Sequence, residues 1–197
     1  RGKVVPYTSI YGYQDTYWLL LKHLYKLTNN PEHLRKAIEI AQNAMETAIR
    51  LNMVTLMAES HWKIAEAQDI LQEYSAAAEN FERASESYAK AAEKIPQLKD
   101  LYQDYSLYMQ AWSEIEKAKH HHAEKKYGQA KEHYEKAADL HKSTQRWSYL
   151  SPNYLALALI EAAEDVSRKE QTEEARNLFQ QAANFFRDVK QSLKARL

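Results

Sequence analysis

One pattern of aromatic and small residues recurs three times along this 197-residue chain. It reads aromatic-x-x-Ala-x-x-x-aromatic-x-x-Ala and occupies residues 74–84, 127–137 and 172–182, with Thr172 in place of the first aromatic residue in the third copy. Spacings of three and four residues put all marked positions on one face of an α-helix. Alanines on that face let a second helix approach closely, and the rings fill the space beside it. A unit repeated in this way indicates a stack of similar helical units.

The composition favours helices throughout the chain. Gly occurs three times and Pro four times, whereas the good helix formers Ala, Glu, Lys, Gln and Leu dominate. With so few turn-forming residues, β-hairpins and sheets are not expected. We therefore predict an all-α fold.

Pro, Gly and Asn divide the chain into about eight helices with short connections. Residues 1–13 are expected to form an irregular lead-in. The first five helices are expected over residues 14–27, 31–52, 54–73, 75–95 and 98–125. The sixth follows a break at Gly128 and ends near residue 142, the seventh ends near residue 169, and the eighth carries Ala175 and Phe179. Asn30 and Ser151 each precede a proline, so both are expected to cap a helix. Short connections imply antiparallel neighbours, hence four helical hairpins. Without a visible linker, residues 14–197 are predicted to form a single domain.

Charge and residue usage exclude several classes of protein. Lys plus Arg and Asp plus Glu number 27 each, and this zero balance argues against a dedicated nucleic-acid binder. The absence of Cys excludes disulfides and thiolate metal sites and suits a reducing cytoplasm. No apolar run reaches the roughly 18 residues that would span a bilayer. Because the sequence starts at Arg1 rather than Met, a piece of a larger protein is also considered.

No group of residues has a spacing that indicates catalysis or metal binding. His120, His121 and His122 are consecutive, so their side chains point about 100° apart on a helix and cannot chelate one ion. His121 and Glu124 could pair, but no third ligand is specified. A Gly-rich phosphate loop, a nucleophile elbow and a Glu-x-x-His signature are all missing. We expect no catalytic residue, no metal and no cofactor, and keep an all-α enzyme or metal carrier only as an alternative.

A row of aromatic residues recurs every three or four residues over residues 102–112. Its members are Tyr102, Tyr105, Tyr108 and Trp112. One interpretation is a seam buried against neighbouring helices. The other is a stripe that faces a partner, because Tyr and Trp are enriched where binding energy concentrates.

The paired pattern resembles the tetratricopeptide repeat (TPR) superfamily, whose unit is a helical hairpin with a small residue midway along its first helix. Ala65, Ala118 and Ala163 stand at that position, each nine residues before a copy of the recurring pattern. The first unit is degenerate, with Tyr25 at the small position. The units are longer than the roughly 34 residues of an ordinary repeat. In this they are similar to the SNAP adaptors of membrane fusion, a likeness carried mainly by residues 127–138 and Trp147.

The resemblance implies a right-handed α-α superhelix of four TPR-like hairpins that acts as a protein–protein interaction module, an adaptor or scaffold binding a peptide or helix on its concave face. Residue by residue, it nominates for that face Lys22, Lys26, Trp62, Glu66, Asp69, Trp112, Lys119, His122, Ile160 and Glu164. The set does not match the Lys/Asn carboxylate clamp of chaperone-binding arrays. Two alternatives stay open: a plain antiparallel bundle, and a sensor or oligomerisation domain cut from a larger regulator such as an NTPase or a transcription regulator.

Overall fold

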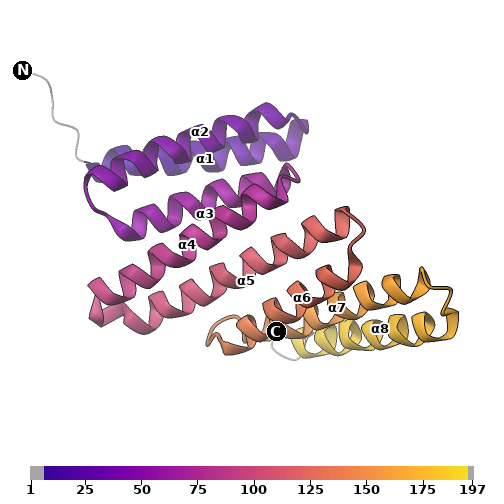
Figure 1. Cartoon of the computed structure of the whole chain (residues 1–197). Coiled ribbons are helices and arrows are strands. Elements are labelled where there is room, and N and C mark those ends of the chain that lie inside the picture. The colour runs from indigo at the N-terminus through magenta and orange to yellow at the C-terminus, as the bar shows by residue number, and fades with distance from the viewer. Residues whose placement is uncertain (1–6, 195–197) are drawn as a thin grey trace, which may run out of the picture. The chain divides into compact units, whose positions relative to one another are not determined.

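The chain folds into helices joined by short turns (Figure 1). A computed structural model describes the backbone of residues 7–194 and the side chains of residues 12–190. Within these residues there are eight α-helices, two 3-10 helices and no strand, which confirms the all-α prediction. The α-helices are α1 (Tyr7–Thr28), α2 (Pro31–Arg50), α3 (Val54–Ile70), α4 (Tyr74–Lys94), α5 (Lys99–Ala123), α6 (Tyr127–Ser143), α7 (Ser151–Ser167) and α8 (Thr172–Lys194). The 3-10 helices are η1 (Pro96–Leu98) and η2 (Ser148–Leu150). The superhelical arrangement stays a prediction.

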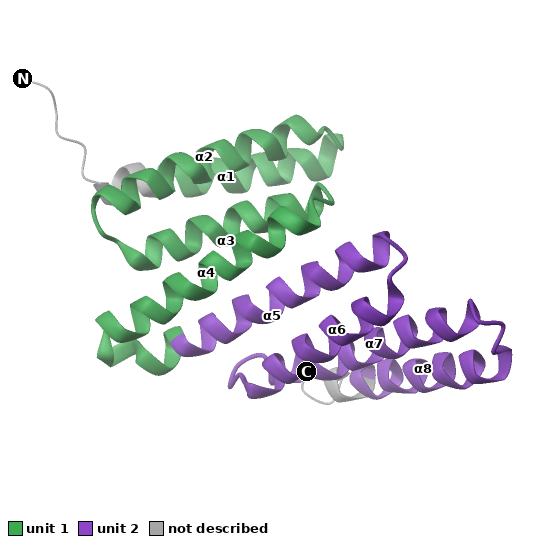
Figure 2. Cartoon of the chain, in the orientation of Figure 1, with its two compact units in different colours: residues 1–102 green, residues 103–197 purple. Residues whose placement is uncertain are grey.

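Two compact units divide the chain (Figure 2). Unit 1 comprises Arg1–Tyr102 and unit 2 comprises Gln103–Leu197, so the boundary falls within α5. The prediction of a single domain over residues 14–197 stays a prediction, and the units are described separately below.

Three local features differ from the sequence-based expectations. The first helix begins at Tyr7, so residues 7–13 of the expected lead-in are helical, while residues 1–6 lie outside the described part. Gly128 does not break the chain before α6 but lies in the first turn of that helix, and the turn itself is made by Lys125 at φ 61°. Ser151 is the first residue of α7, which has no side-chain cap.

Asn30 does cap α2, as predicted. Its side-chain oxygen accepts a hydrogen bond from the backbone N–H of Glu32 at 3.1 Å, and Pro31 follows as the first helical residue. This satisfies one of the four amide groups that a helix N-terminus leaves without an intrahelical partner.

The turns inside the helix pairs share one backbone conformation, a residue with positive φ. Each pair α1–α2, α3–α4, α5–α6 and α7–α8 is joined through a residue in the left-handed region, two positions before the second helix begins. These residues are Asn29 (φ 52°), Gln72 (φ 62°), Lys125 (φ 61°) and Glu170 (φ 61°). A left-handed residue at this place lets the chain reverse while its amide satisfies the last carbonyls of the preceding helix. The same turn therefore recurs in the same register in all four pairs.

Burial follows the recurring pattern. Its six alanines, two in each copy, are all buried: Ala77, Ala84, Ala130, Ala137, Ala175 and Ala182. The alanines of the preceding helices, Ala65, Ala118 and Ala163, are fully buried as well. Small side chains at these places keep neighbouring helix axes close, since the distance between packed helices depends on the residues at the contact. The prediction that the alanines face other helices agrees with this burial.

Candidate functional site

In unit 1, α1 and α3 form a shared surface that carries opposite charges. Lys22 of α1 forms an ion pair with Glu66 of α3, and Lys63 of α3 forms one with Asp15 of α1. The ammonium of Lys22 also lies 5.1 Å from the centre of the Trp18 ring, within reach of a cation–π interaction. Half-buried pairs of this kind align two helices and leave charged heads in contact with water. We call this surface, defined by Lys22, Lys63 and Glu66, the unit 1 face.

In unit 2, α5 and α7 form a comparable surface. The Nδ1 atom of His122 lies 2.9 Å and 3.0 Å from the two carboxylate oxygens of Glu161. Lys119 donates to Glu116 at 2.7 Å, and its ammonium lies 5.8 Å from the centre of the Trp112 ring. We call the surface defined by these five residues the unit 2 face.

Burial of two carboxylates sets the electrostatics of the unit 2 face. Glu116 and Glu161 are both buried, and each contacts a more exposed side chain, Lys119 in the first case and His122 in the second. Burial raises the pKa of Glu161, and the hydrogen bond from His122 partly opposes that effect. A buried carboxylate is costly unless it is paired, so His122 and Lys119 are held in place by the groups beneath them.

The ten residues nominated by the resemblance divide between the two units. The structure pairs Lys22 with Glu66, places Lys119 beside Trp112, and joins His122 to Glu161, a residue that the nomination did not include. Lys26 is exposed on α1, and four others are half-buried on α3 and α7, namely Trp62, Asp69, Ile160 and Glu164. Glu161 could have been found from sequence by its spacing, because it stands four residues after Leu157 and three after Ala158 and therefore shares their side of α7.

The aromatic row on α5 is a packed seam over much of its length. Trp147, from the connector that follows α6, stacks on Tyr108 with ring centres 4.1 Å apart and contacts Tyr105 at 5.1 Å. In unit 1, the Tyr102 ring stacks on Tyr88 at 6.1 Å. These contacts favour the seam interpretation for the three tyrosines. Trp112 remains half-buried at the end of the row that meets the unit 2 face.

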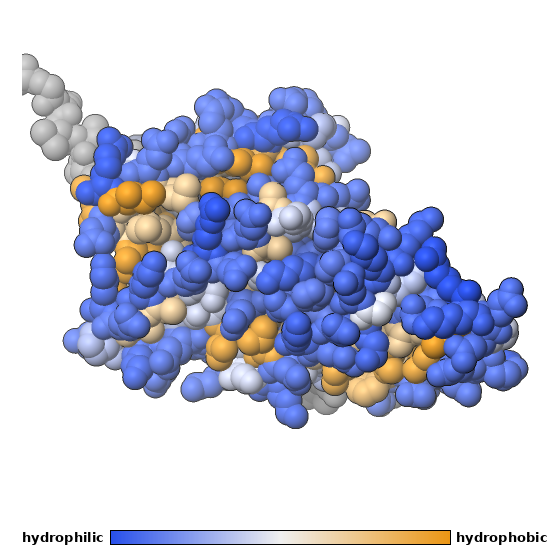
Figure 3. Space-filling model, viewed as in Figure 1, coloured by the Kyte–Doolittle hydropathy of each residue, from blue (hydrophilic) through white to orange (hydrophobic). Residues whose placement is uncertain are grey.

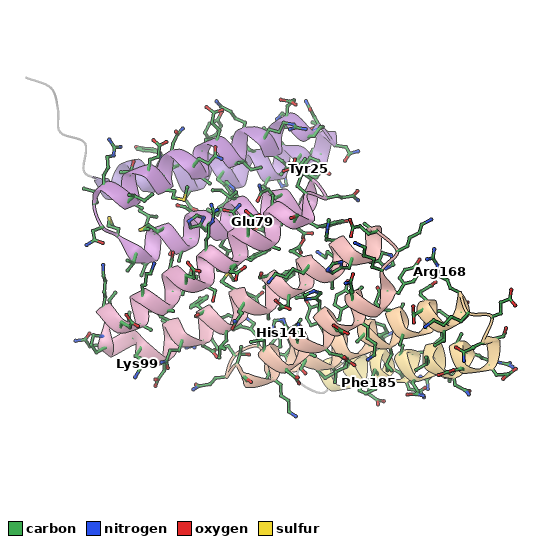
Figure 4. All side chains as sticks on the ribbon, in the orientation of Figure 1. Tyr25, Glu79, Lys99, His141, Arg168 and Phe185 are labelled. Atoms are coloured by element: carbon green, nitrogen blue, oxygen red, sulfur yellow. The ribbon has the colours of Figure 1, made fainter. Side chains whose placement is uncertain are left out.

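Sequence reasoning missed a buried histidine in the core of unit 2. His141 of α6, which is labelled in Figure 4, is fully buried. Its ring packs against the rings of Tyr154 at 5.0 Å and Tyr108 at 5.6 Å. Neither of its ring nitrogens has a hydrogen-bond partner among the described groups. Burial lowers the pKa of His141 to about 4, so its imidazole is neutral at pH 7. The signal was present in the sequence, because His141 continues the recurring pattern four residues after Ala137.

A second missed residue, Asp104, fixes the connector after α6. Its buried carboxylate accepts hydrogen bonds from the backbone amides of Gln145 at 2.6 Å and Arg146 at 3.1 Å. Backbone amides without regular secondary structure need such acceptors when buried. Asp104 thereby holds the chain where Trp147 can reach the aromatic row.

The rings of two histidines near the α5–α6 turn are stacked on each other. The rings of His121 and His133 lie 5.2 Å apart and nearly parallel, and His133 is 2.7 Å from Glu114. The pKa of His121 is lowered by burial and by the neighbouring His133. Within the described residues, no three His, Cys, Asp or Glu side chains are grouped so that they could hold a metal ion.

Comparisons with known proteins do not identify a relative of this chain. No protein family model matches the chain, no curated protein matches it, and no solved structure matches it. Among the described helices, none combines the length and the apolar character needed to cross a membrane.

Proposed function

We propose that this chain is a TPR-like protein–protein interaction module of the cytoplasm, which binds a peptide or helix of another protein and performs no catalysis. The observation that carries the proposal is the unit 2 face. There a half-buried tryptophan, Trp112, lies beside the ammonium of Lys119, and Lys119 and His122 each contact a buried carboxylate.

The arrangement suits recognition because an aromatic anchor is already partly desolvated and its neighbours are already ordered. Binding hot spots are enriched in Trp and Arg and are surrounded by groups that exclude water. Lys119 and His122 are fixed by Glu116 and Glu161, so little side-chain entropy is lost when a ligand contacts them. An extended or helical segment with an apolar anchor and acidic flanks has the matching chemistry.

The unit 1 face supplies a second surface of the same kind. Trp62 is half-buried on α3, and Lys22 and Glu66 present paired opposite charges near it on α1 and α3. Charges at such a rim set the register and the association rate more than they set the affinity. We treat this surface as an independent contact region.

The proposal is tested by affinity capture from the source cells followed by mass spectrometry, with Trp112→Ala as the main variant. We expect a protein that is enriched by the wild-type chain to be lost with W112A, and truncation of an anchor weakens binding by about 2 kcal/mol or more. Since Trp112 also packs against the core of unit 2, a second variant, Lys119→Gln, removes a cationic group from the same face without removing a ring and should also weaken capture of a ligand with acidic flanks.

Tyr149→Ala is the matched control, because Tyr149 is an exposed aromatic residue in η2. It should retain every captured protein. If W112A and K119Q keep the wild-type circular dichroism spectrum and capture the same proteins at the same level, the unit 2 face is not a binding surface.

A further inference from the structure

The last helix of unit 2 exposes rings at positions that are buried in its counterparts. Phe179 of α8 stands at the same place in the recurring pattern as Phe81 of α4 and Tyr134 of α6. Phe81 is 2% and Tyr134 6% exposed, whereas Phe179 is 40% exposed. Phe186, two turns further along α8, is exposed to a similar degree. Ala182, which lies between these rings, is buried and α8 packs on α7, whereas the rings on either side of Ala182 are exposed.

Within unit 2, the helix that follows α6 covers the corresponding rings. Tyr154 of α7 stacks on Tyr134 at 6.3 Å and on His141 at 5.0 Å. Leu157 and Ala158 of α7 pack in the core cluster that contains Tyr134. The recurring pattern thus buries its rings against the next helix along the chain. The exposed rings of α8, which include Phe185 (Figure 4), have the chemistry to receive a helix of the same type as α7. Figure 3 shows orange, apolar side chains in the region that α8 occupies in Figure 1.

The first helix of unit 1, α1, is exposed at a position that is buried in the other first helices. When the first helices of the four pairs are aligned, Leu20 of α1 stands at the position of Ser60, Ser113 and Ala158. Those three residues are at most 3% exposed, but Leu20 is 50% exposed. The side of α1 that corresponds to the ring-covering side of α7 is therefore uncovered.

The uncovered side of α1 is apolar over several turns. Its exposed large residues include Tyr13, Tyr17, Leu19 and Leu20. Three of them also line a hollow of about 450 Å³ between α1 and α2, which Ile40 closes on the α2 side. A hollow lined by apolar groups beside an exposed apolar helix can accept ring side chains.

We propose that α1 of one copy of this chain packs on α8 of a second copy, in the way that α7 packs on α6. The occupant is inferred from the chain itself, because α1 is a helix of the ring-covering type whose matching side is exposed. The proposed arrangement is heterologous: each copy uses its two surfaces for two different neighbours, and association continues beyond a dimer. The proposal involves none of the residues of the unit 1 face or the unit 2 face, and it can fail without affecting the proposed function.

The test is sedimentation velocity of the 197-residue chain over a wide range of concentration. For the wild type, we expect the weight-average mass to rise with concentration past that of a dimer. Phe179→Glu and Leu20→Glu each place a charge on one of the two surfaces, and both residues are exposed enough for the fold to tolerate the change. Each variant alone should lose the association.

Mixing the two variants gives a sharper result than either alone. Leu20→Glu leaves α8 intact and Phe179→Glu leaves α1 intact, so an equimolar mixture has one functional interface and should form a dimer that grows no further. Ile49→Glu, which removes an exposed apolar side chain from α2, is the matched control and should associate like the wild type.

Three outcomes would overturn the proposal. The first is a wild-type chain that remains monomeric at every concentration, which would leave these surfaces to another protein. The second is a Leu20→Glu variant that still dimerises, since α8 would then pair with α8. The third is a mixture of the two variants that remains monomeric.

Discussion

Replacing His141 with phenylalanine should remove much of the acid sensitivity of unit 2. The His141 imidazole is fully buried and its pKa is lowered to about 4, because burial disfavours the charged form. In the unfolded chain the same group titrates near pH 6.5. Above that pH both states are neutral, and the full stability is present. As the pH falls from about 6.5 toward 4, the unfolded chain takes up a proton that the folded chain refuses, so stability is lost.

The magnitude follows from the two pKa values. Between pH 7 and pH 5 the difference amounts to a loss of about 2 kcal/mol in the free energy of unfolding. Phenylalanine is a suitable replacement because α8 carries Phe186 at the equivalent position. It also removes two buried nitrogens that have no partner among the described groups, so the variant should be no less stable than the wild type at pH 7.

The assay is urea unfolding at pH 7 and pH 5, with hydrogen exchange of α6 peptides to assign the change to unit 2. Other groups with shifted pKa values, such as His61 and Glu161, are present in both proteins and cancel in the comparison. Tyr134→Phe is the control, because it alters a neighbouring buried ring without removing a group that titrates in this range. If His141→Phe loses as much stability between pH 7 and pH 5 as the wild type does, the buried imidazole is not the cause.

Two further predictions concern the helices themselves. Ala130 is fully buried, so Ala130→Leu should overpack the α6 contact and lower the free energy of unfolding by about 1–3 kcal/mol. Gln129→Leu, at the exposed neighbouring position, should lower it far less. Equal melting temperatures for the two variants would mean that Ala130 has room around it. Gly128 lies in the first turn of α6 without a positive φ, and a Cβ atom there would meet nothing within 4 Å. Gly128→Ala should therefore stabilise the chain by up to about 1 kcal/mol, because it lowers the entropy of the unfolded state, and a decrease in melting temperature would contradict this reasoning.

Local sequence signals predicted much of the helical architecture. The Asn30–Pro31 pair located a helix start correctly, because a side-chain cap and a fixed proline φ act within a few residues. The Gly128 prediction was wrong because a glycine near a turn need not make it, and here Lys125 adopts the left-handed conformation instead. Such a choice depends on how the two flanking helices pack, which no single residue in the turn reveals.

For the candidate site, the sequence nominated residues for a binding face but did not predict which of them pair with one another. It nominated Lys22 and Glu66 for one face, and the structure joins them across α1 and α3. It missed Glu161 and His141, because a carboxylate or imidazole on a helix is usually exposed. Which of these side chains become buried depends on the helices that pack against them.

By itself the sequence determined the helical class, the spacing of the recurring pattern and the side of each helix that must be buried, because helix periodicity follows from backbone geometry alone. The tertiary structure decided which buried positions find a covering helix. Phe179 and Tyr134 share the same local pattern, yet one is exposed and the other is buried. Burial is a property of what packs against a residue, and that information is not contained in the segment to which the residue belongs.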